Sequence, residues 1–296
     1  MRTFSHPGYK RFLLSVGCLL SIHFTALFFL TLFRLVFFFS ANYDFPDQEH
    51  VGFMSIWPAF IRGVWFDNVI ACYILLIPLV AVSISALFNY YGKILWNVTC
   101  IFFSLFYGIV LLVTAANIPY FQYFFKIINS SVFNWFGYMN TTAGMVFGET
   151  SYYPPLIGFL LTLVLFIWLM RRLIRHFQRL LNTKNPSVFW LDRIYIFLTA
   201  GICIGLCLFG IRGRTGYNPI KVSAAYYCTD PFLNQLGISP VFNLLSSTLD
   251  DSRKENRYLH LMPENEALEN PRHYLNRPGI EGISPIARQI NASDSL

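Results

Sequence analysis

Long apolar runs alternate with short polar segments along the first 211 residues, and this pattern predicts helices that cross a membrane. A helix needs roughly 20 mostly apolar residues to span the hydrocarbon core of a bilayer. Five runs meet or approach that length, at 12–33, 69–88, 94–116, 154–170 and 194–211. We therefore predict an all-α, polytopic membrane protein with five transmembrane helices.

The composition supports this class and excludes several others. Hydrophobic residues make up 55% of the chain and charged residues only 12%, whereas soluble domains carry about 25% charged residues. Such a balance argues against a water-soluble globule, a disordered chain and a coiled coil. The six cysteines contain no CxxC pair and suggest no disulfide framework.

The distribution of charge predicts the orientation in the membrane, because cytoplasmic loops retain Lys and Arg. With the N-terminus inside, the cytoplasmic segments hold ten basic residues and one acid, Asp192, while the outer loops hold three basic residues and five acids. We therefore expect a cytoplasmic N-terminus and an extracytoplasmic C-terminus. The tail after the fifth run has nine residues of each sign, so it carries no basic excess that indicates a nucleic-acid partner.

Two aromatic segments between the runs are predicted to lie at the membrane surface. Residues 51–66 are broken by Gly52, Pro58 and Gly63 and are too short to cross, so we expect an interfacial segment. The loop 117–153 groups many aromatic side chains and is expected to follow the outer surface of the bilayer. Together they are expected to form a roof or cleft at the outer leaflet.

The C-terminal region divides into two parts. Asn218-Pro219 and Ser239-Pro240 each place a capping side chain before a proline, which is a helix-start signal. Residues 212–249 are therefore predicted to form juxtamembrane interfacial helices. Residues 250–296 are polar, contain four prolines and lack a sustained hydrophobic period, so we predict an extended extracytoplasmic linker.

No catalytic motif is found, and the candidate chemistry is the binding of a lipid head group. The chain has no HExxH, Walker A or GxSxG sequence, and its six histidines are scattered. Arg34 can be an interface anchor near the outer end of the first run, or its guanidinium fork can bind phosphate through two parallel hydrogen bonds. The predicted head-group residues are expected to lie at the same depth, on the outer side of the membrane. They are Arg34, Lys126, Arg212 and Arg214, supported by Asp67 and Glu149.

Several motifs on the outer side resemble a known family. They are FRLVFFF at 33–39, FIRGVWFD at 60–67, NIPYFQYFFKIINSSVF at 117–133, GETSY at 148–152, IRGRTGYNPIKVSAAYY at 211–227 and SPVFNLLSS at 239–247. In this order they resemble the membrane half of lipoteichoic acid synthase-like proteins of the sulfatase superfamily. Phosphoethanolamine transferases of the outer leaflet are similar in plan.

The resemblance implies a multi-pass protein of the bacterial inner membrane that serves the transfer of phosphoglycerol, or a similar phospho-group, from a phospholipid to a glycolipid or polymer. In that family an external α/β domain holds a divalent metal (Mn, Mg or Zn) and a Thr nucleophile. This chain contains neither, so we expect no cofactor in it and a catalytic domain that is downstream or separate. The alternatives are a phosphoethanolamine transferase-type membrane domain and a non-enzymatic lipid-binding scaffold.

Overall fold

The computed structural model describes residues 6–41, 53–138, 144, 148–181, 190–253 and 262–275. Within these ranges the regular elements are α-helices and short 3-10 helices, with no strand. The chain divides into two compact units, residues 1–248 and residues 249–296.

Five long helices build the first unit, and each is long and apolar enough to cross a membrane. They are α1 (Pro7–Ser40), α2 (Phe53–Leu87), α3 (Lys93–Phe124), α5 (Tyr153–Leu181) and α6 (Trp190–Arg212). All five predicted runs fall within these helices to within one residue. The prediction of an all-α polytopic membrane protein is confirmed.

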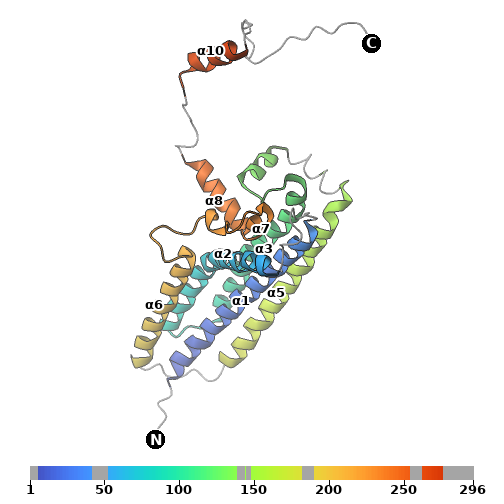
Figure 1. Ribbon diagram of the computed structural model, residues 1–296. Coiled ribbons are helices and arrows are strands. Elements are labelled where there is room, and N and C mark those ends of the chain that lie inside the picture. The colour runs from blue at the N-terminus through green and yellow to red at the C-terminus, as the bar shows by residue number, and fades with distance from the viewer. Residues whose placement is uncertain are drawn as a thin grey trace. The chain divides into compact units, whose positions relative to one another are not determined.

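Helix α1 forms the centre of the bundle and contacts α2, α3, α5 and α6, while α2 packs on α6 and α3 packs on α5 (Figure 1). Its buried face includes Phe12, Leu19 and Ile22, none of which is exposed. Helices α1, α2 and α3 have 34, 35 and 32 residues, well above the roughly 20 that span a bilayer. Their ends therefore extend beyond the hydrocarbon core and can carry a structure outside it.

Helix α2 differs from the sequence-based expectation at its N-terminal end. The described part of the segment 51–66 is continuous with the second span and forms its first turns, although Pro58 lies within it. Ala59 and Phe66 on this segment are fully buried. Packing of one helix face therefore offsets the backbone hydrogen bond lost at the proline, and the separate interfacial segment that we expected is replaced by a longer helix.

The region after α6 folds back onto the bundle, and we call residues 220–248 the cap. It contains η3 (Val222–Ala225), α7 (Pro231–Leu236) and the part of α8 (Pro240–Ser252) that belongs to the first unit. Helix α7 contacts α1 and α2, and η3 contacts α2. The cap thus rests on the extended ends of the bundle helices (Figure 1).

Of the two predicted helix starts in this region, one is confirmed and one is wrong. Helix α8 begins at Pro240, directly after Ser239. No helix begins at Asn218-Pro219, and the next element starts only at Val222. The same type of signal operates instead at Asp230-Pro231, where the Asp230 carboxylate accepts a hydrogen bond from the Leu233 N–H at 2.8 Å and caps α7.

The second unit contains helix α10 (Glu264–Leu275). The extended linker predicted for 250–296 is therefore wrong over this range. The sequence ENEALEN at 264–270 is rich in Glu, Ala and Leu, whose intrinsic helix propensity is high even without an apolar period. Residues 254–261 and 276–296 lie outside the described ranges.

Candidate functional site

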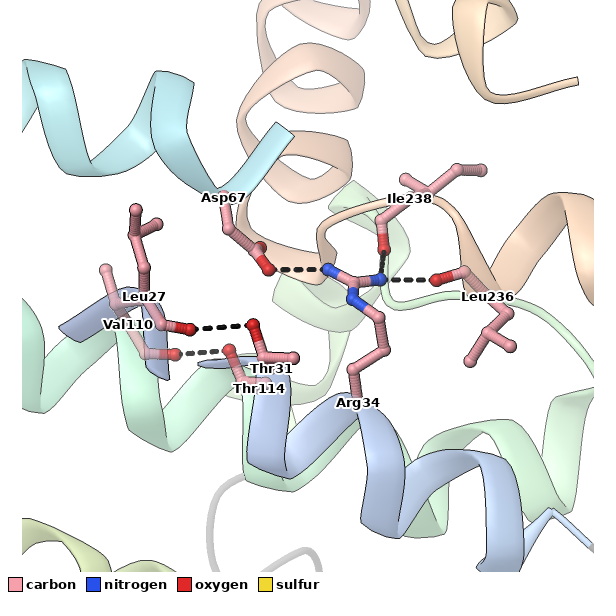
Figure 2. Close-up of polar contacts among 8 residues, drawn as sticks. All are labelled: Leu27, Thr31, Arg34, Asp67, Val110, Thr114, Leu236 and Ile238. Carbon is pink, nitrogen blue, oxygen red and sulfur yellow. Dashed lines mark hydrogen bonds and ion pairs between the residues drawn. The ribbon is translucent and has the colours of Figure 1, made fainter. Parts of the chain in front are cut away.

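The buried ion pair between Arg34 and Asp67 is the centre of the candidate site. Arg34 lies on α1 and Asp67 on α2, and the guanidinium Nη2 donates to the carboxylate Oδ2 at 2.6 Å (Figure 2). The two side chains are only 4% and 2% exposed. Charged groups withdrawn from water to this degree are retained only with a partner of opposite charge.

The same guanidinium also holds the cap. Its Nη1 donates to the backbone carbonyl of Leu236 and, at 3.1 Å, to that of Ile238 (Figure 2). Leu236 is the last residue of α7, and the carbonyls at a helix end lack partners within the helix. Arg34 satisfies them, so one side chain connects α1, α2 and the cap.

Gly63 provides the space that this arrangement needs. It lies one turn before Asp67 on α2, and a Cβ atom at this position would overlap the Arg34 guanidinium. Any larger residue would push the guanidinium away from the carboxylate. The glycine that interrupts the apolar pattern of 51–66 is therefore explained by a close approach between two helices.

The space beside Arg34 is small. A cavity of about 10 Å³ is lined by Arg34 together with residues of α1, α3 and the start of α8. The hydroxyls of Thr31 and Thr114 nearby donate to carbonyls of their own helices, at Leu27 and Val110 (Figure 2). Such a cavity is too small for a phosphate group, so a head group could reach Arg34 only if the cap moved.

Asn234 gives the cap its internal rigidity. The side-chain oxygen accepts hydrogen bonds from the backbone N–H groups of Tyr227 at 2.9 Å and Cys228 at 3.2 Å. Its amide nitrogen donates to the Cys228 carbonyl at 2.7 Å. Asn234 is only 5% exposed, and it satisfies a turn that has no regular secondary structure.

Arg62 and Tyr227 join the cap to α2. Arg62 Nε donates to the carbonyl of Ala224 at 3.3 Å, and its guanidinium lies 4.5 Å from the centre of the Tyr227 ring. The Tyr227 hydroxyl donates to the Ser55 carbonyl at 2.6 Å. Burial raises the pKa of Tyr227, the neighbouring Cys228 raises it further, and the charge of Arg62 opposes the rise. Tyr227 therefore remains a neutral hydrogen-bond donor at ordinary pH.

Amide side chains of α3 and of the cap hold the chain that leaves α3. Asn117 accepts from the Ile128 N–H at 3.0 Å, and Asn243 on α8 donates to the Ile128 carbonyl at 2.9 Å. The Gln235 side-chain oxygen accepts from the Ile127 N–H at 3.1 Å. These side chains supply the hydrogen bonds that this irregular backbone cannot form with a neighbouring strand or helix.

The remaining sequence-predicted site residues lie on the surface of the described structure. Lys126 and Glu149 are exposed. Arg212 donates to the carbonyls of Gly216 and Tyr217, and Arg214 Nε donates to that of Asn218 at 2.6 Å, all within their own loop. Of the six predicted residues, the structure thus brings Arg34 and Asp67 into direct contact.

Three residues important to this site carried no clear signal in the sequence. Gly63 suggested a break in a helix, and Asn117 marked only the end of an apolar run. Asn234 lies in the six-residue helix α7, whose start at Asp230-Pro231 was not predicted from the sequence. A polar residue at the end of a long apolar run, as at Asn117, is the one pattern that could have pointed to a buried amide.

The donor set for a metal ion is also absent from this region. Within the described ranges, no group of three or more His, Cys, Asp or Glu side chains is placed to hold a metal ion. The divalent metal implied by the resemblance therefore has no fitting site among these residues.

Comparisons with known proteins do not assign the chain to a family. No protein-family model, curated protein or solved structure matches it. The resemblance to the lipoteichoic acid synthase-like proteins therefore stays a prediction.

Proposed function

We propose that this protein is the membrane-anchoring and lipid-presenting module of a phospho-group transferase of the lipoteichoic acid synthase-like type. It acts at the outer leaflet of the bacterial inner membrane, with the N-terminus in the cytoplasm. The observation that carries the proposal is the three-way connection at Arg34. It joins α1, α2 and the cap through buried hydrogen bonds.

A cap that is held firmly on the bundle suits a module that positions a catalytic domain. The contacts of Arg34, Arg62 and Asn243 tie the cap to α1 and α2 and to the chain after α3, so α8 begins from a defined place on the bundle. A domain that is attached to or docked beside α8 starts from that place. Holding a catalytic group near its membrane substrate lowers the entropic cost of their encounter.

Three surface cations at the capped end, Lys126, Arg212 and the half-buried Arg214, are the proposed head-group contacts. Arg212 and Arg214 lie in the loop that Trp65 of α2 holds through a hydrogen bond from its indole nitrogen to the Gly213 carbonyl. Lys126 directly precedes Ile127, which is bound to the cap. Phosphate is recognised by such cations. Arg34 and Asp67 then act as positioning residues that hold the cap between these surfaces.

The test follows labelled glycerol from phosphatidylglycerol into glycolipid in cells that lack this protein. We expect the transfer to be lost, to return with the wild-type chain, and to fall severalfold with Lys126→Gln, Arg212→Gln and Arg214→Gln combined. A matched control neutralises three exposed cations elsewhere, with Lys10→Gln, Lys93→Gln and Arg193→Gln. We expect this control to transfer as the wild type does.

Each other result counts against the proposal in a defined way. If phosphoethanolamine transfer is lost and phosphoglycerol transfer is kept, the donor group is wrong. If neither transfer changes on deletion, the transferase assignment is wrong and a lipid-binding scaffold replaces it.

A further inference from the structure

The outward face of α5 carries a hollow lined almost entirely by basic side chains. Its volume is about 430 Å³, and its lining residues are Trp168, Arg172, Arg175, His176 and Arg179. All five are exposed. These residues lie in the C-terminal half of α5. The C-terminal end of α5 lies at the end of the bundle where α1 begins, away from the cap (Figure 1).

Helix geometry places these residues on one face. Trp168, Arg172, Arg175 and Arg179 follow each other at intervals of four, three and four positions, and His176 lies four positions after Arg172. Such intervals bring side chains together along an α-helix. Phe166, Met170 and Ile174 on another face of α5 are buried, and Phe177 faces Gly17 of α1. The basic face therefore points away from the bundle, towards the lipid and its head groups.

The protein offers these cations no carboxylate partner along this part of the chain. No Asp or Glu occurs between residues 150 and 191. The next acid, Asp192, is fully buried and lies 2.8 Å from His6 Nδ1. The positive charge of the hollow is thus available to an anion from outside the chain.

Trp168 sets the depth of the hollow in the membrane. It follows a long apolar stretch of α5 and precedes the first arginines at 171 and 172, and Trp favours the boundary between acyl chains and head groups. The Arg172 guanidinium lies 5.3 Å from the centre of the Trp168 ring, which is a cation–π contact. The arginines are therefore held at the level of lipid phosphates.

We propose that this hollow binds the head group of an anionic phospholipid with two phosphates, in the leaflet opposite to the cap. Arg172 and Arg179 are separated by seven positions, which is about 10 Å along a helix. The line of basic side chains from Arg172 to Arg179 is therefore longer than one phosphate group and can contact two. Basic clusters directly beside a transmembrane helix bind anionic head groups through such forks and charges. This site is distinct from the head-group contacts proposed at the capped end.

The test measures lipid binding to the full-length chain, delipidated in neutral detergent, by native mass spectrometry. The probes are diphosphatidylglycerol, phosphatidylglycerol, phosphatidylcholine and inorganic pyrophosphate. We expect diphosphatidylglycerol to bind most tightly, and pyrophosphate at equal concentration to leave it bound. Arg172→Gln, Arg175→Gln and Arg179→Gln combined should weaken its binding by about tenfold or more.

Matched variants separate the hollow from general surface charge. Lys10→Gln, Lys93→Gln and Arg193→Gln combined remove the same charge at the same end of the bundle, and we expect less than a twofold change. Trp168→Leu keeps every charge and should weaken binding severalfold. Lysine in place of Arg172, Arg175 and Arg179 keeps the charge but removes the forked guanidinium, and should also weaken lipid binding.

The proposal is overturned if the Arg→Gln and the control variants lose equal affinity, because general surface charge then explains the binding. It is also overturned if pyrophosphate binds as tightly as the lipid and displaces it, since the ligand is then a soluble anion. A melting temperature within a few degrees of wild type shows that a variant is folded. If the triple Arg→Gln variant fails this check, Trp168→Leu and the Arg→Lys variant decide the question.

Discussion

Arg34 on α1 and Asp67 on α2 form an ion pair of 2.6 Å with both side chains almost fully buried. The pair also orients Arg34 towards the two carbonyls of the cap (Figure 2). It therefore links the packing of two long helices to the position of a segment about 200 residues later in the chain.

Breaking the pair on one side should strongly destabilise the protein. Asp67→Asn leaves the Arg34 charge buried without a counter-charge, and we expect a loss of about 3–5 kcal/mol in unfolding free energy. Chemical denaturation in detergent micelles measures it. The exposed pair Arg253–Asp250, at 3.6 Å, is the control, and Asp250→Asn should cost less than about 1 kcal/mol. Equal effects of the two substitutions would contradict a buried role for Asp67.

Replacing both members by apolar residues should recover most of the loss. Arg34→Met with Asp67→Val removes both charges and changes the side-chain volumes little, and such exchanges are often neutral or stabilising. The cap carbonyls at Leu236 and Ile238 still lose their donor. We therefore expect a stable bundle with faster hydrogen exchange in residues 231–248. Exchange in this range at the wild-type rate would show that Arg34 does not hold the cap.

Gly63→Ala should act like a mutation of Arg34, because the new methyl group occupies the place of the guanidinium. We expect a loss of about 2 kcal/mol or more. Gly201→Ala on α6 is the matched control, since a Cβ there meets nothing within 4 Å. Alanine is favoured over glycine in a helix by about 1 kcal/mol, so the control should be neutral or stabilising. Melting temperatures of the purified variants distinguish the two, and a stable Gly63→Ala would refute the close approach.

Asn234→Ala should loosen the cap from within. The substitution leaves the half-buried N–H groups of Tyr227 and Cys228 without their acceptor, at a cost of about 1 kcal/mol each. Hydrogen exchange in residues 222–236 should increase by at least tenfold. The control is Asn97→Ala at an exposed position of α3, where exchange in the cap should not change. If protection of the cap survives Asn234→Ala, other contacts hold this turn.

Because of Tyr91, which lies between α2 and α3, we expect the stability of the protein to depend on pH in the alkaline range. Burial raises its pKa to about 12, although the nearby Arg11 lowers it; Arg11 lies 4.7 Å from the ring centre. The unfolded chain ionises this phenol near its ordinary value of about 10. A group with a raised pKa in the folded state contributes stability below the unfolded pKa and loses it as pH rises through the folded pKa.

We therefore expect the stability difference between wild type and Tyr91→Phe to be constant below about pH 10. Between about pH 10 and about pH 12 the wild type should lose stability relative to the variant. Melting temperatures of both proteins across this range give the difference, in which the other sixteen tyrosines cancel. A difference that does not vary with pH would show that Tyr91 is not buried as described.

The general architecture could be read from the chain because it depends on local properties. Apolar runs of sufficient length form helices in a bilayer, where each backbone polar group must be satisfied within its own segment. The helices exceed those runs because polar and aromatic residues at their ends also pack. The N-terminal part of α2 shows this, since Gly63 and Pro58 suggested a break that packing against α1 and the cap prevents.

The sequence by itself determined the class of this protein, its five long helices and the start of α8 at Pro240, because apolar length and capping chemistry act within a few residues. It also singled out Arg34 and Asp67 as charges beside apolar runs. Only the tertiary structure decided that these two pair with each other, that Gly63 makes room for them, and that Asn234 stabilises the cap. These contacts join residues that are distant in the chain, and which buried donor meets which acceptor depends on how the helices pack.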